Sequence, residues 1–221
     1  MSVFLKWIAE KERYTLSPAG YVLFIAVIIL LLIIASLITK SDKKKRLSAR
    51  QLAFCSMSIA LATVTSFIKV FEFPTGGSIT LLSMFFVCFI GYLYGPKIGI
   101  LSAVAYGILQ LIIEPKIYFP MQILIDYVLA FGALGLSGFF NKQKWGMITG
   151  FLAGIFGRFI FSTISGAVFF GEYAWEGWNP VLYSIVYNAI YIFAEGAVTI
   201  IILLIPAVKT QLVRVKNMAQ D

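Results

Sequence analysis

The sequence predicts an all-α integral membrane protein, built as a helical bundle. Hydrophobic residues make up 60% of the 221 residues, charged residues only 13%, and the mean hydropathy is +0.92. A soluble domain of this length carries more charge on its surface. Strand-like alternation is absent, and most apolar runs approach the roughly 20 residues that a spanning helix needs. Seven such runs lie near residues 19–39, 49–71, 79–94, 97–113, 120–140, 145–171 and 180–208.

The first run, 19–39, is predicted to be an additional transmembrane helix that precedes one compact domain at 49–208. It begins too late and runs too long for a cleaved secretory signal, and no small-residue cleavage site follows it. The tail before it, 1–18, includes VFLKWIAEKERY, which favours a short amphipathic helix at the outer membrane interface.

A basic linker at 40–48 follows the first run. Its lysines, together with Arg46 and Arg50, lie between two helix ends, which favours a cytoplasmic position or contact with anionic lipid. Nucleic-acid binding is the alternative for such a run, and the position beside the membrane argues against it. With the linker in the cytoplasm, seven spans place the N-terminus outside and the C-terminal tail, 209–221, in the cytoplasm.

The residue inventory excludes several classes of chemistry. The chain has no histidine, the commonest general base and metal ligand, so we expect neither a hydrolase triad nor a metal site. We also expect no cofactor. Cys55 and Cys88 lie inside predicted helices, as small buried hydrophobic residues do. The sequence has no G-x-x-x-x-G-K-[ST] phosphate-binding loop. Any ATP-driven work must therefore come from a partner.

In the second run, Ser56 and Ala60 are four residues apart and lie on one helix face. Small residues at this spacing let another helix approach closely, either from a partner protein or from within the bundle. The connection that follows, FEFPTGGSITLLSM, has a proline to end the helix and Gly76 and Gly77 to allow a mobile or tightly turned backbone. It is either a simple connection or an outer flap over a pocket.

Asp126, in the fifth run, is the most informative single residue. It lies about 10 Å below the outer helix end if each residue rises about 1.5 Å. A carboxylate inside the membrane is costly unless it faces a cavity, a cation or a donor, so it marks a site; a structural hydrogen bond to a neighbouring helix is the alternative. Gln122, one turn above, and Tyr127, beside it, add polar groups at similar depth.

Arg158 and Glu195 are the other charges deep in the predicted bilayer, about 20 Å and 22 Å from their outer helix ends. Their matching depth and opposite sign predict a structural ion pair below the pocket, because either charge alone would be costly. A proton relay is the alternative.

The stretch from Arg158 to Asn188 is the most specific part of the chain and is interpreted as a ligand pocket. Two apolar segments flank a short loop, and Ser162 and Asn188 lie about 13 and 12 Å from its two ends on helices of ordinary rise. Two polar groups therefore meet at one depth. The loop carries Glu172, Tyr173, Trp175, Glu176 and Trp178.

The chain from about residue 46 to 208 resembles the energy-coupled thiamine transporter family, the substrate-binding components of energy-coupling-factor transporters. The resemblance rests on four blocks in the same order: FPTGGSITLLSM, LYGPKIG, QILIDYVLAFGALGLSG and ISGAVFFGEYAWEGWNPVLYSIVYNA. It implies a six-helix bundle in the plasma membrane of a prokaryote. The bundle binds thiamine from outside and docks on a transmembrane coupling subunit with two cytoplasmic ATPases, and the 19–39 helix lies outside that pattern.

The resemblance also implies roles for individual residues. Asp126 faces the cationic ligand, Phe170 supplies an aromatic face, and Tyr183 and Asn188 supply polar contacts. Ser162 stands one turn before Gly166, where the family members compared have histidine, and Phe170 replaces a tryptophan seen in some members.

Two other functions remain open from the sequence. A membrane enzyme acting on a lipid would use Asp126, Arg158 and Glu195 as its polar centre, but the sequence has no metal-binding aspartate cluster. A ligand-free assembly helper is disfavoured by the loop aromatics and the buried carboxylate. Within the transporter interpretation, a related vitamin or a thiamine precursor is the alternative ligand.

Overall fold

The computed structural model describes residues 5–8, 13–19, 22, 47–73 and 76–220. Nearly all of the predicted 19–39 helix and of the 40–48 linker lies outside the described residues. In the N-terminal tail, β1 (Leu5–Ile8) pairs antiparallel with β2 (Arg13–Leu16). The prediction of an amphipathic helix in this tail is therefore wrong.

The rest of the described chain is helical apart from one hairpin, and the predicted all-α membrane fold class is confirmed. Four described segments are long and apolar enough to cross a membrane, while α3 is apolar but only 12 residues long. Six crossings for the domain therefore remain a prediction. The helical elements are α2 (Ala49–Ser66), α3 (Ser83–Tyr94), α4 (Pro96–Ile113), η3 (Ile123–Ala130), α5 (Phe131–Ala133), η4 (Leu134–Phe140), α6 (Gly146–Phe169), η5 (Gly171–Tyr173), α7 (Pro180–Leu204) and α8 (Pro206–Gln220).

Several predicted boundaries are wrong by a few residues. The helix in the second run ends at Ser66, and the chain then forms β3 (Lys69–Glu72), which pairs antiparallel with β4 (Ser78–Thr80). Apolar residues on a short hairpin look like a helix extension in a hydropathy pattern. At the other end, Pro206 interrupts the last run after Leu204, because proline cannot donate the helical hydrogen bond.

Local sequence signals explain where the helices begin. Ser48 and Gln51 form a capping box, in which each side chain bonds the backbone N–H of the other residue at 3.1 and 3.0 Å. Asn179 caps α7 through its side-chain oxygen, with Pro180 at the first helical position, where a missing N–H costs nothing.

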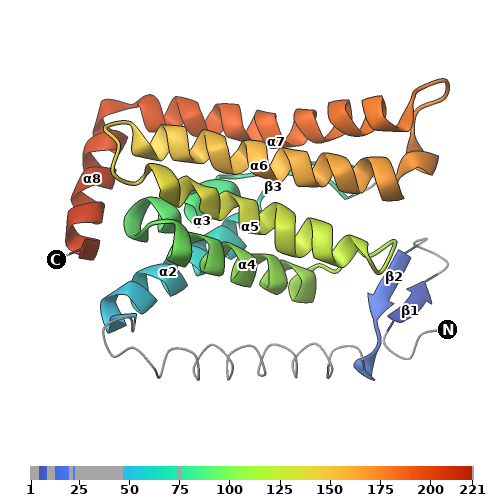
Figure 1. The fold of residues 1–221 in the computed structure, drawn as a ribbon, viewed down its shortest axis with the longest axis horizontal. Helices are drawn as coiled ribbons and strands as arrows, with labels where there is room; N and C mark the ends of the chain where they lie inside the picture. Colours follow the sequence, from blue (N-terminus) through green and yellow to red (C-terminus); the bar gives the residue numbers. More distant parts are fainter. Residues whose placement is uncertain (1–4, 9–12, 20–21, 23–46, 74–75, 221) are drawn as a thin grey trace.

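The long helices α6 and α7 lie side by side, and the composite segment η3–α5–η4 runs next to α6 (Figure 1). Gly107 of α4 faces the Tyr127 carbonyl, and an added Cβ would come within 1.9 Å of that oxygen. Only glycine therefore lets α4 pack this closely against η3.

The loops that precede α4, α6 and α8 lie at one end of the bundle. The α8 helix turns across this end (Figure 1), where Gln220 donates to the Leu93 carbonyl at 2.7 Å and Lys216 donates to the Asn141 carbonyl. The β3–β4 hairpin, the 114–122 connection and the 170–179 loop all belong to the opposite end, where the site lies.

Candidate functional site

A cavity of about 170 Å³ opens between the β3–β4 hairpin, α4, η3, α6 and α7. All the predicted ligand residues except Trp175 line it. They are Gly76, Gly77, Gln122, Asp126, Tyr127, Ser162, Gly166, Phe170, Tyr183 and Asn188.

Asp126 is held in place by Gln122, whose Nε2 donates to its Oδ2 at 2.8 Å. Gln122 is itself fixed, because its Oε1 accepts from the Tyr118 N–H at 3.0 Å and its Nε2 also donates to the Lys116 carbonyl at 3.2 Å. The Asp126 carboxylate therefore has a defined orientation in the cavity wall, with capacity left to accept further hydrogen bonds.

The segment that carries Asp126 and Tyr127 is a π-helix, η3. π-helical turns are rare and occur frequently at functional sites, because they displace side chains from their α-helical positions. The Tyr127 hydroxyl accepts from the Lys116 N–H at 2.9 Å and donates to the Glu114 carbonyl at 3.3 Å. This residue thus ties the cavity wall to the end of α4.

On α7, three tyrosines at four-residue spacing follow the cavity inward: Tyr183, Tyr187 and Tyr191. Consecutive ring centroids are 5.5 and 5.9 Å apart. Asn188 lies among them, with its Oδ1 accepting from the Tyr191 hydroxyl at 2.6 Å and its Nδ2 donating to the Ser184 carbonyl at 2.8 Å. The outer and middle parts of this wall are therefore aromatic, with a preoriented amide.

The outer rim is also aromatic. Phe170 is buried and packs edge-on against Tyr118, with ring centroids 5.1 Å apart. Trp175 is 47% exposed and packs edge-on against the cavity-lining Tyr183, with ring centroids 5.2 Å apart. The structure therefore places Trp175 beside the mouth and outside the cavity lining.

The β3–β4 hairpin lies over the cavity and needs both of its glycines. Gly76 has φ of 112°, a conformation that favours glycine. A Cβ at Gly77 would come within 2.7 Å of the Tyr191 ring, and the Gly77 N–H donates to the Tyr187 hydroxyl at 3.2 Å. Of the two alternatives left open by the sequence, this placement favours a flap over a pocket.

The predicted ion pair between Arg158 and Glu195 is not formed among the described residues. Glu195 is 4% exposed, and its two oxygens accept from the backbone N–H groups of Thr80 and Met84 and from the hydroxyls of Thr80 and Ser83, at 2.7–3.2 Å. It caps the start of α3, which has no side-chain cap of its own. Arg158 and Glu195 lie at similar depth but do not pair, because backbone N–H groups and hydroxyls satisfy the Glu195 carboxylate.

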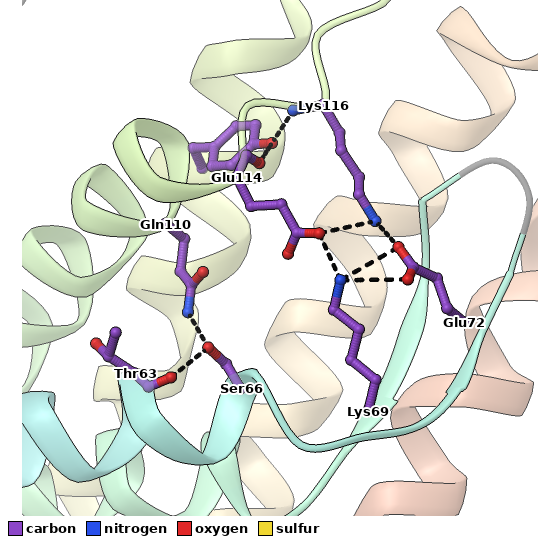
Figure 2. Close-up of polar contacts among 8 residues, drawn as sticks. Thr63, Ser66, Lys69, Glu72, Gln110, Glu114 and Lys116 are labelled. Atoms are coloured by element: carbon purple, nitrogen blue, oxygen red, sulfur yellow. Dashed lines mark hydrogen bonds and ion pairs between the residues drawn. The ribbon is translucent and has the colours of Figure 1, made fainter. Parts of the chain in front are cut away.

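Four charged residues at the mouth, which we call the mouth cluster, join the hairpin to the end of α4 (Figure 2). Lys69 and Glu72 come from β3, and Glu114 and Lys116 follow α4. Lys69 pairs with Glu114 and with Glu72, the latter at 3.3 Å, while Lys116 pairs with Glu72 and lies 3.7 Å from Glu114. Glu114 and Lys116, which line the cavity, were not predicted as site residues, because charges in a short connection between helices have no distinctive sequence pattern.

We expect Glu72→Gln to lower the unfolding midpoint slightly at neutral pH and not at all at low pH. Hydrogen bonding from Lys116 lowers the pKa of Glu72, so its stabilisation is present above the ordinary glutamate pKa of about 4.3 and is lost as pH falls through the folded-state value. Glu72 is exposed, so the difference should stay below about 1 kcal/mol. Thermal unfolding of both proteins from pH 7 to pH 3 measures it; a difference that does not change with pH would contradict the assignment.

Among the described residues, no three histidine, cysteine, aspartate or glutamate side chains come together as metal ligands would. The cavity instead combines a fixed carboxylate, aromatic walls and an oriented amide. Such a surface suits a flat organic cation that carries polar groups.

Comparison with known proteins finds relatives with similar sequences and folds. A Bacillus subtilis (strain 168) protein named thiamine transporter ThiT is 33% identical over 144 residues, which cover 59% of this chain and 74% of that protein. A second thiamine transporter ThiT, from Lacticaseibacillus paracasei, is 29% identical over 114 residues, or 44% of this chain and 57% of that protein.

A solved structure of ThiT from Listeria monocytogenes superposes with a TM-score of 0.62 at 28% identity, covering 73% of this chain and 96% of that chain. Residues 52–214 match the family model described as thiamine transporter protein (Thia_YuaJ). This match spans the described bundle from α2 into α8, including the whole cavity, so the chain belongs to the thiamine transporter family.

Proposed function

We propose that this chain is the thiamine-binding specificity subunit of an ATP-driven vitamin importer. The observation that carries the proposal is Asp126, a carboxylate fixed by Gln122 in the wall of a membrane-embedded cavity with aromatic sides. Family membership makes the chain a transport protein rather than an enzyme.

Thiamine is a cation built of two flat rings, a thiazolium and an aminopyrimidine, that are joined by a methylene group. Asp126 supplies the opposite charge, and cation–π contact with an aromatic face contributes about 0.5 to 2 kcal/mol where the site is desolvated. In the proposed arrangement, Phe170 and Tyr183 enclose the ring system and Asn188 helps to fix its orientation. No cofactor is needed for binding alone.

Titration with thiamine while recording tryptophan fluorescence tests the proposal. Trp175 and Trp178 lie at the mouth with ring centroids 4.9 Å apart, so their emission should change saturably at nanomolar to micromolar thiamine. Trp175→Phe should reduce the change, whereas Trp145→Phe, at the opposite end of the bundle, should not. Absence of any saturable change in wild type, supported by absence of competition with labelled thiamine, would contradict the proposal.

The sequence has no phosphate-binding loop, so in an ATP-driven importer the ATP hydrolysis must come from partners. In the proposal these are a transmembrane coupling subunit and two cytoplasmic ATPase subunits, and the coupling subunit contacts the Ser56–Ala60 face of α2. Both side chains are exposed, whereas Cys55, Ser58 and Ala62 form the buried face of α2. This exposure argues against the alternative that Ser56 and Ala60 serve packing within the bundle.

Ala60→Trp should abolish thiamine uptake by cells and leave thiamine binding near normal, because a large side chain blocks close helix approach without touching the cavity. Uptake of labelled thiamine and binding to the purified protein are measured in parallel. Ala197→Trp, at an exposed position on α7, is the matched control and should transport normally. Equal losses of binding and uptake in Ala60→Trp would refute the assignment of this face.

The proposed orientation has the cavity mouth and the N-terminus outside and the C-terminus in the cytoplasm. A cysteine at Ser2 should then react with an impermeant reagent in intact cells, and one at Thr210 only after lysis. The natural cysteines, Cys55 and Cys88, are both buried and give little background. Labelling of Ser2→Cys only after lysis would contradict a spanning helix at 19–39.

A further inference from the structure

Arg158 is a charged group in the cavity that the proposed thiamine contacts do not use. It lies on α6 one turn inward from Ser162, about 6 Å along the helix axis, and it lines the same cavity as Asp126. Its guanidinium lies over the Phe131 ring, 4.3 Å from the centroid. Its Nε is buried and has no hydrogen-bond partner within the described part of the chain.

Glu195 cannot readily serve as the missing partner. An ionised carboxylate has about four lone-pair sites, and Glu195 already accepts four hydrogen bonds from the hairpin and the start of α3. The amide nitrogen of Gln110 is engaged elsewhere, donating to Ser66 at 2.9 Å and to Tyr106, and within the described part of the chain no hydrogen bond joins the amide oxygen of Gln110 to Arg158. An intramembrane arginine that has no hydrogen-bond partner among the described residues therefore lines the cavity, where such a charge marks a functional site.

A guanidinium has five N–H donors and no acceptor, and it is charged at every physiological pH. The group that complements it must be a hydrogen-bond acceptor or an anion. We propose that Arg158 forms an acceptor-binding subsite at the inner end of the cavity, so that the ligand is a cation at its Asp126 end and an acceptor at its Arg158 end. The Phe131 ring holds the guanidinium in place without using its donors.

This inference rests on the proposed function for the identity of the ligand. In thiamine, the ring nitrogens of the neutral aminopyrimidine are the acceptors; in a thiamine phosphate ester, the phosphate is a second acceptor of the same kind. Asp126 recognises the charge, and Arg158 recognises the acceptor. Substitutions of the two residues should therefore have different effects on the binding of ligands that carry only one of these groups.

The test is calorimetric titration of wild type, Arg158→Met and Arg158→Lys with three ligands: thiamine, thiamine monophosphate and the neutral alcohol 4-amino-5-hydroxymethyl-2-methylpyrimidine. We expect Arg158→Met to weaken thiamine and the neutral alcohol by the same factor, about 10- to 100-fold. Asp126→Asn should weaken thiamine and leave the alcohol unchanged. Arg214→Met, which removes an exposed arginine of α8, is the matched control and should bind like wild type.

Unfolding of the ligand-free proteins separates recognition from a structural role. Removing an unpaired buried charge should leave the unfolding midpoint of Arg158→Met unchanged or raised, whereas a structural arginine predicts a fall. Arg158→Lys keeps the charge, so this variant should fold. It loses the planar guanidinium with its paired N–H donors, so it should bind the alcohol more weakly than wild type does. A loss confined to thiamine monophosphate would assign the subsite to the phosphate.

The subsite would be overturned if folded Arg158→Met and Arg158→Lys bound all three ligands, thiamine, the alcohol and thiamine monophosphate, at least as tightly as wild type does. A wild type that fails to bind thiamine would contradict the proposed function instead. The subsite is then decided by thermal shifts with the neutral alcohol and with inorganic phosphate. If either compound raises the unfolding temperature of wild type and Arg158→Met removes that rise, the subsite is supported. If neither compound changes the unfolding temperature of wild type, the subsite is overturned.

Discussion

Asp126→Asn is expected to weaken thiamine binding about 30- to several-thousand-fold. The substitution keeps the shape of the side chain and deletes its charge, and losing one partner of a buried, hydrogen-bonded charge pair costs about 2–5 kcal/mol, at about 1.4 kcal/mol per tenfold change in dissociation constant. A surface charge would contribute far less. Titration calorimetry on the purified proteins measures the ratio.

The matched control is Glu176→Gln, which removes an exposed carboxylate from the loop before α7, outside the cavity lining. It should change the dissociation constant by less than about twofold, since exposed charges are screened by water and salt. If Asp126→Asn bound thiamine as tightly as wild type does, Asp126 would not be the residue that recognises the cation.

Glu195→Gln should lower the free energy of unfolding by about 3 kcal/mol, the largest stability effect we expect from a single conservative change. The amide has one acceptor oxygen where the carboxylate had two, so part of the donor set of Thr80, Ser83 and Met84 loses its partner inside the protein. Unfolding of the protein in mild detergent by added dodecyl sulfate gives the free-energy difference.

The control for Glu195→Gln is Glu172→Gln, in the exposed loop after α6, which should unfold like wild type. Since Glu195 anchors the residues that follow the β3–β4 hairpin, its loss should also weaken thiamine binding indirectly. An unchanged unfolding free energy would show that the four hydrogen bonds contribute nothing to stability.

Much of this architecture could be predicted from the sequence because the membrane imposes a simple rule on it. Long apolar runs have few alternatives to helices, and α4, α6 and α7 follow the predicted runs closely. Asp126 stood out for the same reason, since a carboxylate inside such a run is costly unless it has a purpose.

The sequence could not predict features that depend on how helices face one another. Depth along a helix says nothing about its rotation, so Arg158 and Glu195 were paired wrongly. The π-helical turn of η3 and the hairpin over the cavity depend on tertiary contacts that hydropathy does not report. Tyr187 and Tyr191 were missed, although Tyr183, Tyr187 and Tyr191 recur every four residues and therefore lie on one face of α7.

Equilibrium dialysis of the purified protein against labelled thiamine tests the central claim most directly, because it counts bound ligand without relying on an optical signal. We predict saturable binding of one thiamine per chain, competed by unlabelled thiamine and strongly weakened in Asp126→Asn. Non-saturable binding, or saturable binding that Asp126→Asn leaves intact, would contradict the account of this cavity as the thiamine site.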